Sequence, residues 1–269
     1  MTKYAFVQIL AMFLILPSYI GCSHVDGNTA QEAYYQIEGN VFDPSQLRQA
    51  AIKLERARKA YPNDPWVYMT ESLATLVSGY KIGDWYKLNT FTEGSVDRAL
   101  DLAKMAVELG PNESQAYAHL ARIYIIKRKY KTAWSLLNEA HERSPESFYP
   151  WYFRGIISEQ MRDATRATWY FDEADKCAKY DYQREIVNIH RQAVAKFTGN
   201  LGEQERLLKE NIDRNPSNPY GYGNYASFLM KQKRYDEAID NWERAIRIAP
   251  YPHAVEQLEE AKRLKQSNG

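Results

Sequence analysis

The sequence predicts an all-α chain built from about six helical hairpins that repeat along its length. The first observation is a set of alanines spaced 34 residues apart, Ala99, Ala133 and Ala167, with a second series at Ala106, Ala140 and Ala174. The second is a proline five residues after the later alanine of several units, at Pro62, Pro111, Pro145 and Pro250. The third is helical patterning, since Tyr222, Tyr225, Ala226 and Leu229 follow the i, i+3, i+4, i+7 spacing of one helix face.

The units follow one another with few interruptions. We expect them at 31–64, 65–113, 114–147, 148–184, 185–218 and 219–252, followed by a capping helix and tail at 253–269. Helix starts are marked by Asp43-Pro44, Asp64-Pro65 and Asn218-Pro219, each an N-cap residue followed by proline at the first helical position. The small alanines allow the two helices of a hairpin to approach closely where they cross.

The repeat pattern resembles the tetratricopeptide repeat. Residues 114–147 carry the resemblance almost throughout, with Tyr117, Leu120, Ala121, Tyr124, Ala133, Leu137, Ala140 and Pro145. The unit 185–218 departs most, because Gln192, Gln204 and Asn211 occupy positions for small residues, and Glu38 is out of pattern in the first unit. The resemblance implies a right-handed superhelix with a concave groove lined by the first helix of each repeat.

That resemblance also implies a partner-binding groove. Carried over by position, the groove would be lined by Trp66, Met69, Arg122, Tyr149, Tyr152 and Tyr220. These side chains favour protein or peptide segments that insert apolar side chains. The alternative is that several of these rings pack against neighbouring repeats. No lysine stands at position 2 or 5 of the well-matched repeats, so a chaperone-type clamp for a peptide carboxylate is not expected.

An aromatic insertion interrupts the second unit at 79–94. It holds Tyr80, Trp85, Tyr86 and Phe91. An insertion of this length in a repeat array is typical of a binding loop. The alternative is a lid that folds back over the first two repeats.

The first 21 residues are interpreted as a signal peptide. Lys3 precedes the apolar run 5–16, which is too short to span a bilayer as a helix. A short membrane anchor or a buried helix is the alternative. Ile20-Gly21-Cys22 resembles a bacterial lipobox, which implies a palmitate-bearing Cys22, a tether over 22–30, and an outer-membrane lipoprotein facing the periplasm.

Composition excludes several function classes. Lys and Arg number 35 against 34 Asp and Glu, a formal charge of +1. Binding dominated by nucleic acid or anionic lipid needs a basic excess or a basic patch, so neither is expected as a partner. No metalloprotease motif, cysteine pair or phosphate loop is present, so we expect no catalytic residues, metal, cofactor or small-molecule substrate. His119 and His190, at equivalent repeat positions, are interpreted as surface histidines, with a metal pair as the alternative.

The function expected from these features is a non-catalytic scaffold that docks or assembles a cell-envelope complex. The architecture resembles that of pilotins of type IV pilus secretins. One alternative is an adaptor or regulator of cell-wall enzymes or proteases. A third reading is a self-assembling structural protein, against which the charged last helix argues.

Overall fold

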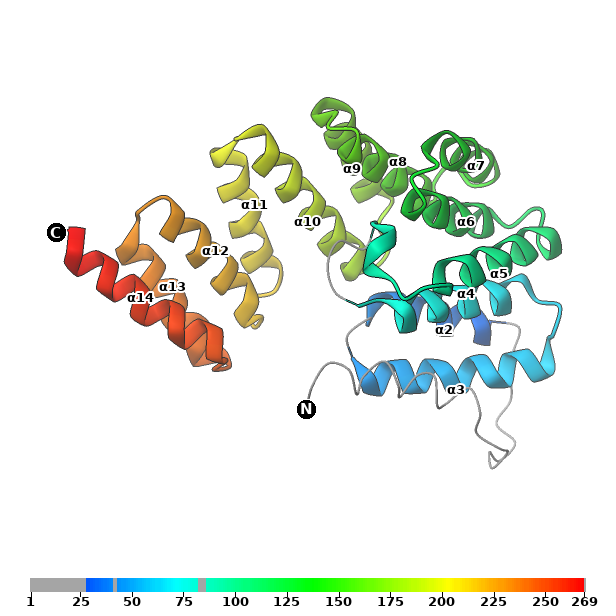
Figure 1. Cartoon of the computed structure of the whole chain (residues 1–269), viewed down its shortest axis with the longest axis horizontal. Helices are drawn as coiled ribbons and strands as arrows, with labels where there is room; N and C mark the ends of the chain where they lie inside the picture. Colours follow the sequence, from blue (N-terminus) through cyan, green and yellow to red (C-terminus); the bar gives the residue numbers. More distant parts are fainter. Residues whose placement is uncertain (1–27, 41–42, 82–85, 269) are drawn as a thin grey trace.

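The computed structural model describes residues 28–40, 43–81 and 86–268, and within these ranges it holds thirteen α-helices, one short 3-10 helix and no strand (Figure 1). The all-α prediction is therefore confirmed. The signal peptide, Cys22 and most of the expected tether lie outside the described residues. None of the helices in the described ranges is sufficiently long and apolar to cross a membrane.

The helices pair into successive antiparallel hairpins. They are α2 (Thr29–Gly39) with α3 (Pro44–Ala60), α4 (Pro65–Gly79) with α5 (Ser95–Leu109), α6 (Ser114–Ile126) with α7 (Tyr130–Arg143), α8 (Phe148–Gln160) with α9 (Ala164–Cys177), α10 (Asp181–Thr198) with α11 (Leu201–Arg214), and α12 (Pro219–Lys231) with α13 (Tyr235–Ile248), followed by α14 (Pro252–Asn268). The 3-10 helix η1 (Leu88–Thr90) lies between α4 and α5. Three starts differ from the expected boundaries, because α2 begins inside 22–30, α10 begins inside 148–184 and α14 begins at Pro252, inside 219–252.

Local sequence explains the helix starts and the close packing. Asp64 accepts a hydrogen bond from Trp66 N at 2.9 Å, and Asn218 accepts one from Tyr220 N at 3.0 Å, so both cap a helix that starts with proline. The two alanine series are fully buried where paired helices cross. Gly155 in α8 has the same role, since a Cβ there would lie 2.5 Å from the ring of Phe171 in α9.

The hairpins stack in chain order from the blue α2 to the red α14 (Figure 1). The first helices of successive hairpins pack side by side, as α2 with α4, α4 with α6, α6 with α8 and α8 with α10. One large apolar cluster runs from α4 to α10, and a second joins α2, α3 and α4. The last hairpins are held by two smaller clusters around Leu208 and Trp242.

Candidate protein-binding surfaces

The inner face of the array, formed by the first helix of each hairpin, carries the predicted groove residues. Trp66, Met69, Arg122, Tyr149 and Tyr152 are all buried in the described structure. The expectation of an open groove at these five residues is therefore wrong. The sixth residue, Tyr220, is exposed.

One carboxylate from α2, that of Glu38, binds side chains of three other helices at the inner face. Glu38 accepts hydrogen bonds from Arg122 of α6 and from the hydroxyl of Tyr149 of α8. Tyr182 of α10 donates to Glu38 at 3.5 Å and lies 2.9 Å from the Tyr149 hydroxyl. The end of α2 thus contacts three later hairpins, and we call Glu38, Arg122, Tyr149 and Tyr182 the clasp.

The clasp is a buried ion pair within an aromatic shell. The side chains of Arg122 and Glu38 are only 5% and 9% exposed, and the guanidinium lies 5.0 Å from the centre of the Phe153 ring. Burial is the largest single influence and would lower the pKa of Arg122, but the charge of Glu38 together with the neighbouring tyrosine hydroxyls raises that pKa well above its ordinary value. Burial and the Glu38 charge together raise the pKa of Tyr149, so its hydroxyl stays protonated and can donate.

His119 lies beside the clasp and is fully buried, so its interpretation as a surface histidine is wrong. The Ser72 hydroxyl donates to the carbonyl of Ala99 at 2.7 Å and therefore accepts from His119 Nε2 at 2.8 Å. His119 Nδ1 then accepts from the hydroxyl of Tyr34 at 3.1 Å. Burial, followed by the charge of Arg122, holds the pKa of His119 well below its ordinary value. The ring is thus a neutral hydrogen-bonding link between α2, α4 and α6, and the described residues hold no cluster of metal ligands.

The described part of the insertion also packs inward. Tyr80 and Phe91 form an antiparallel bridge, and Lys81 N donates to Thr90 O at 2.8 Å. Tyr86 is buried, with its hydroxyl 3.1 Å from that of Tyr152. The described part of the insertion therefore covers core, as in the lid alternative, but Tyr86 packs on α8 of the fourth hairpin and not on the first two repeats. Trp85 lies outside the described residues.

The inner face opens at the C-terminal hairpins. On α10, Tyr182, Ile186 and Ile189 follow i, i+4, i+7 spacing, so Ile189 continues the stripe that faces the clasp. Ile189 is 59% exposed, and Tyr220 at the start of α12 is 60% exposed. We call these two residues the open inner face.

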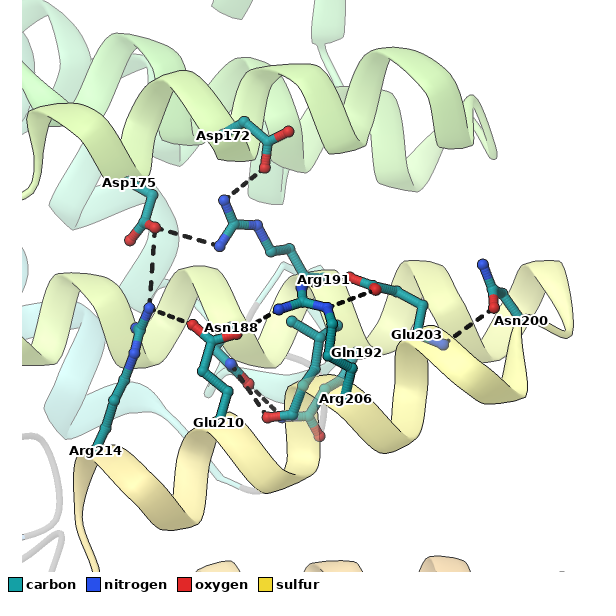
Figure 2. Close-up of polar contacts among 11 residues, drawn as sticks. Asp172, Asp175, Asn188, Arg191, Gln192, Asn200, Glu203, Arg206, Glu210 and Arg214 are labelled. Atoms are coloured by element: carbon teal, nitrogen blue, oxygen red, sulfur yellow. Dashed lines mark hydrogen bonds and ion pairs between the residues drawn. The ribbon is translucent and has the colours of Figure 1, made fainter.

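A cleft of about 950 Å³ lies between α9, α10 and α11. Figure 2 shows how charged side chains join its walls: Arg191 of α10 binds Asp172 at 2.5 Å and Asp175 at 3.3 Å, both from α9. Arg214 of α11 bonds to Glu210 at 2.5 Å on its own helix and lies 3.9 Å from Asp175. These cations all form ion pairs with carboxylates of the same chain. The charged side chains at this cleft therefore connect the α8/α9 hairpin to the α10/α11 hairpin.

Comparison with known proteins supports the hairpin assignment. The family model described as Tetratricopeptide repeat matches residues 219–252. Among solved structures, pilF of Pseudomonas aeruginosa is 14% identical with a TM-score of 0.52, covering 87% of this chain and 98% of its own. Yeast Tom70 is 17% identical with a TM-score of 0.54, and the match covers 90% of this chain and 50% of Tom70. The fold is a tetratricopeptide-repeat superhelix.

A third solved structure, YrrB, described as a TPR protein with an unusual peptide-binding site, is 18% identical with a TM-score of 0.45 and covers 77% of this chain and 97% of its own. No curated protein matches the sequence significantly. No enzyme family is indicated, and tetratricopeptide arrays are interaction scaffolds that bind peptides and proteins.

Sequence reasoning missed the side chains that fill this tetratricopeptide groove. The repeat pattern marks Glu38 only as out of pattern, and it does not assign Tyr182 or His119 to the inner face. The available signal was Glu38 itself, because a carboxylate at a packing position needs a buried cationic partner. Arg122, isolated among apolar groove positions, was that partner.

Proposed function

We propose that this chain is a non-catalytic scaffold whose open inner face binds protein segments carrying apolar side chains. The observation that carries the proposal is the exposure of Ile189 and Tyr220 on first helices, beside a face that is otherwise filled. Isolated exposed apolar residues are common, but two on the concave side of a repeat array form an anchor pair for a partner.

The partner is proposed to be a component of the bacterial cell envelope. The lipobox-like Ile20-Gly21-Cys22 supports a chain anchored by lipid on Cys22, in the outer membrane and facing the periplasm. The shared fold with pilF, over 98% of that chain, supports a pilotin-like docking role in outline only, because the identity is 14%.

The experiment is co-purification from detergent-solubilised membranes at native expression. Ile189→Asp places a charge on the open inner face and is expected to remove the partner, and Tyr220→Ala is expected to weaken its recovery. Ile52→Asp is the matched control, since Ile52 is also an exposed isoleucine but lies on α3, outside the inner face. Recovery of the same partner with Ile189→Asp, or its loss with Ile52→Asp, refutes the open inner face as the site.

Two further measurements separate the parts of the proposal. Mass spectrometry of the mature N-terminus is expected to find lipidated Cys22, and a free Met1 or an unmodified Cys22 refutes the anchor. Recovery of a cell-wall enzyme or protease as the only partner would favour the adaptor role. Concentration-dependent self-association in sedimentation would favour the structural role.

A further inference from the structure

The hairpin topology sorts the connections of the chain onto two edges. Each hairpin is antiparallel and successive first helices pack side by side, so the turns within hairpins lie along one edge and the linkers between hairpins along the other. In Figure 1 the α8/α9, α10/α11 and α12/α13 turns lie at the upper ends of their hairpins. We call the turns 127–129, 161–163, 199–200 and 232–234 with their flanking residues the turn edge.

The turn edge carries exposed cations that form no ion pair with the described residues, alongside the carboxylates of Asp163, Asp236 and Glu237, which pair with other residues. Six of its exposed basic residues are Arg128, Lys129, Arg162, Lys196, Lys231 and Lys233. None of these six forms an ion pair with any residue in the described part of the chain. Between Ser114 and Asn138 the sequence holds no Asp or Glu at all, so every charged residue of the α6/α7 turn itself is basic, and of these Lys127 pairs with Asp97 of α5.

Three of these turns hold a basic residue in the left-handed backbone region. Arg128, Arg162 and Lys233 have φ values of 56°, 62° and 58°, and the equivalent residue of the α10/α11 turn is Gly199 at 71°. Glycine adopts this conformation without strain, whereas arginine and lysine adopt it at a cost to stability. The basic side chains therefore stand where folding alone favours glycine.

The opposite edge carries charges of both signs, since Lys59, Lys179 and Arg247 are exposed there. The linkers between hairpins and the helix ends beside them carry Glu108, Glu142, Glu146 and Asp213, all exposed. The formal charge of +1 for the whole chain thus conceals an edge on which exposed cations gather.

Aliphatic side chains stand beside the cations of the turn edge. Met161 is 64% exposed next to Arg162, and Leu201 is 48% exposed two residues after Gly199. The linker edge also exposes apolar residues, such as Leu109 beside the carboxylate of Glu108 and Ile248 beside Arg247. Cations combined with aliphatic tips are found together at the turn edge.

We propose that the turn edge docks on an anionic phospholipid surface. Lysine and arginine attract anionic head groups, and neighbouring aliphatic tips insert shallowly at the head-group boundary. A nucleic acid is disfavoured because the exposed tips of these turns are aliphatic, whereas single strands are held by aromatic stacking. A single acidic peptide is disfavoured because the cations are spread over four hairpins and not gathered in one pocket. Docking through the turn edge requires no lipid on Cys22, so its test is independent of the test of the proposed anchor.

The test is sedimentation of the full chain with vesicles of phosphatidylcholine alone and of phosphatidylcholine mixed with phosphatidylglycerol. The apolar run 5–16 contributes to both vesicle types, so the measured quantity is the ratio of the two partition constants. The triple variant Arg128→Gln, Lys129→Gln, Lys233→Gln is expected to lower this ratio about a hundredfold. In about 1 M salt, where the Debye length is about 3 Å, the wild-type ratio should approach one.

The matched control is Lys179→Gln, Arg244→Gln, Arg247→Gln, which changes the net charge equally but on exposed residues away from the turn edge. It is expected to keep most of the wild-type ratio, with helical circular dichroism verifying that both variants are folded. An equal loss in both variants would mean that net charge alone acts, and overturns the proposal. An unchanged ratio in the turn-edge variant, or tight binding to single-stranded nucleic acid without vesicle preference, also overturns it.

Discussion

Removal of the Glu38 carboxylate should open the filled inner face. Glu38→Ala leaves the Arg122 guanidinium buried, without its charged partner and with Nε already lacking a hydrogen-bond partner. Deleting one member of a buried ion pair costs about 3 to 5 kcal/mol, because the remaining charge is not compensated. We therefore expect the free energy of unfolding of the N-terminal hairpins to fall by about that amount.

The assay is urea denaturation combined with amide hydrogen exchange. Loss of the clasp should raise exchange in α2 and at the start of α10, which Glu38 joins through Tyr182. Glu32→Ala is the control on the same helix, since Glu32 is 55% exposed and binds Lys53 at 2.9 Å. An exposed pair contributes about 0 to 1 kcal/mol, so this variant should resemble the wild type.

A second variant distinguishes charge from lost volume. Adding Arg122→Met to Glu38→Ala removes the uncompensated charge and is expected to recover much of the stability. Equal stability losses for Glu38→Ala and Glu32→Ala would refute the clasp as an energetic link. Failure of Arg122→Met to recover any stability would refute the assignment of the loss to a buried charge.

Three further predictions concern single side chains. His119 is buried and its pKa lies well below the ordinary 6.5, so below pH 6.5 the unfolded chain binds a proton that the folded chain does not. The free energy of unfolding should therefore fall as the pH drops below 6.5, by at most about 1.4 kcal/mol per pH unit. Urea midpoints measured against pH should lose this dependence in His119→Gln, and the same pH dependence in that variant would contradict the prediction. Gly155→Ala should destabilise the protein by about 1 to 3 kcal/mol, because the new Cβ meets the ring of Phe171. Gly202→Ala is the control and should be neutral or stabilising, because the nearest atom to its new Cβ is Asn200 Oδ1 at 3.8 Å. Thermal melts that rank the two variants the other way would refute the close approach of α8 and α9 as the reason for Gly155. Tyr86→Phe removes the hydroxyl contact with Tyr152 and should lower the free energy of unfolding by about 1 kcal/mol. It should also raise amide hydrogen exchange over 86–91. Unchanged exchange there would mean that this contact does not stabilise the insertion.

Local patterns were sufficient to predict the hairpins. The alanine series and the proline starts act over one or two helical turns, and the structure buries the alanines and caps the helices with Asp64 and Asn218. The filled inner face depends instead on the curvature of the array. Curvature brings Glu38 against residues 84, 111 and 144 positions later, and no pattern within one repeat encodes such contacts.

The near-zero net charge argues against anionic lipid as a partner, and this inference is limited for a different reason. Net charge is a sum over the whole chain, whereas a repeat array places equivalent positions of every unit on the same edge. Arg128 and Arg162 are 34 residues apart and Lys233 occupies the same place two units later, so cations at one repeat position add up along one edge. Some of the carboxylates that cancel them in the total, such as Glu108 and Glu142, stand at the other end of the helices. In such an array, the charge at each repeat position has to be considered before a class of partner is excluded from the net charge. In this nearly neutral protein, the charges at the turn positions form a basic edge.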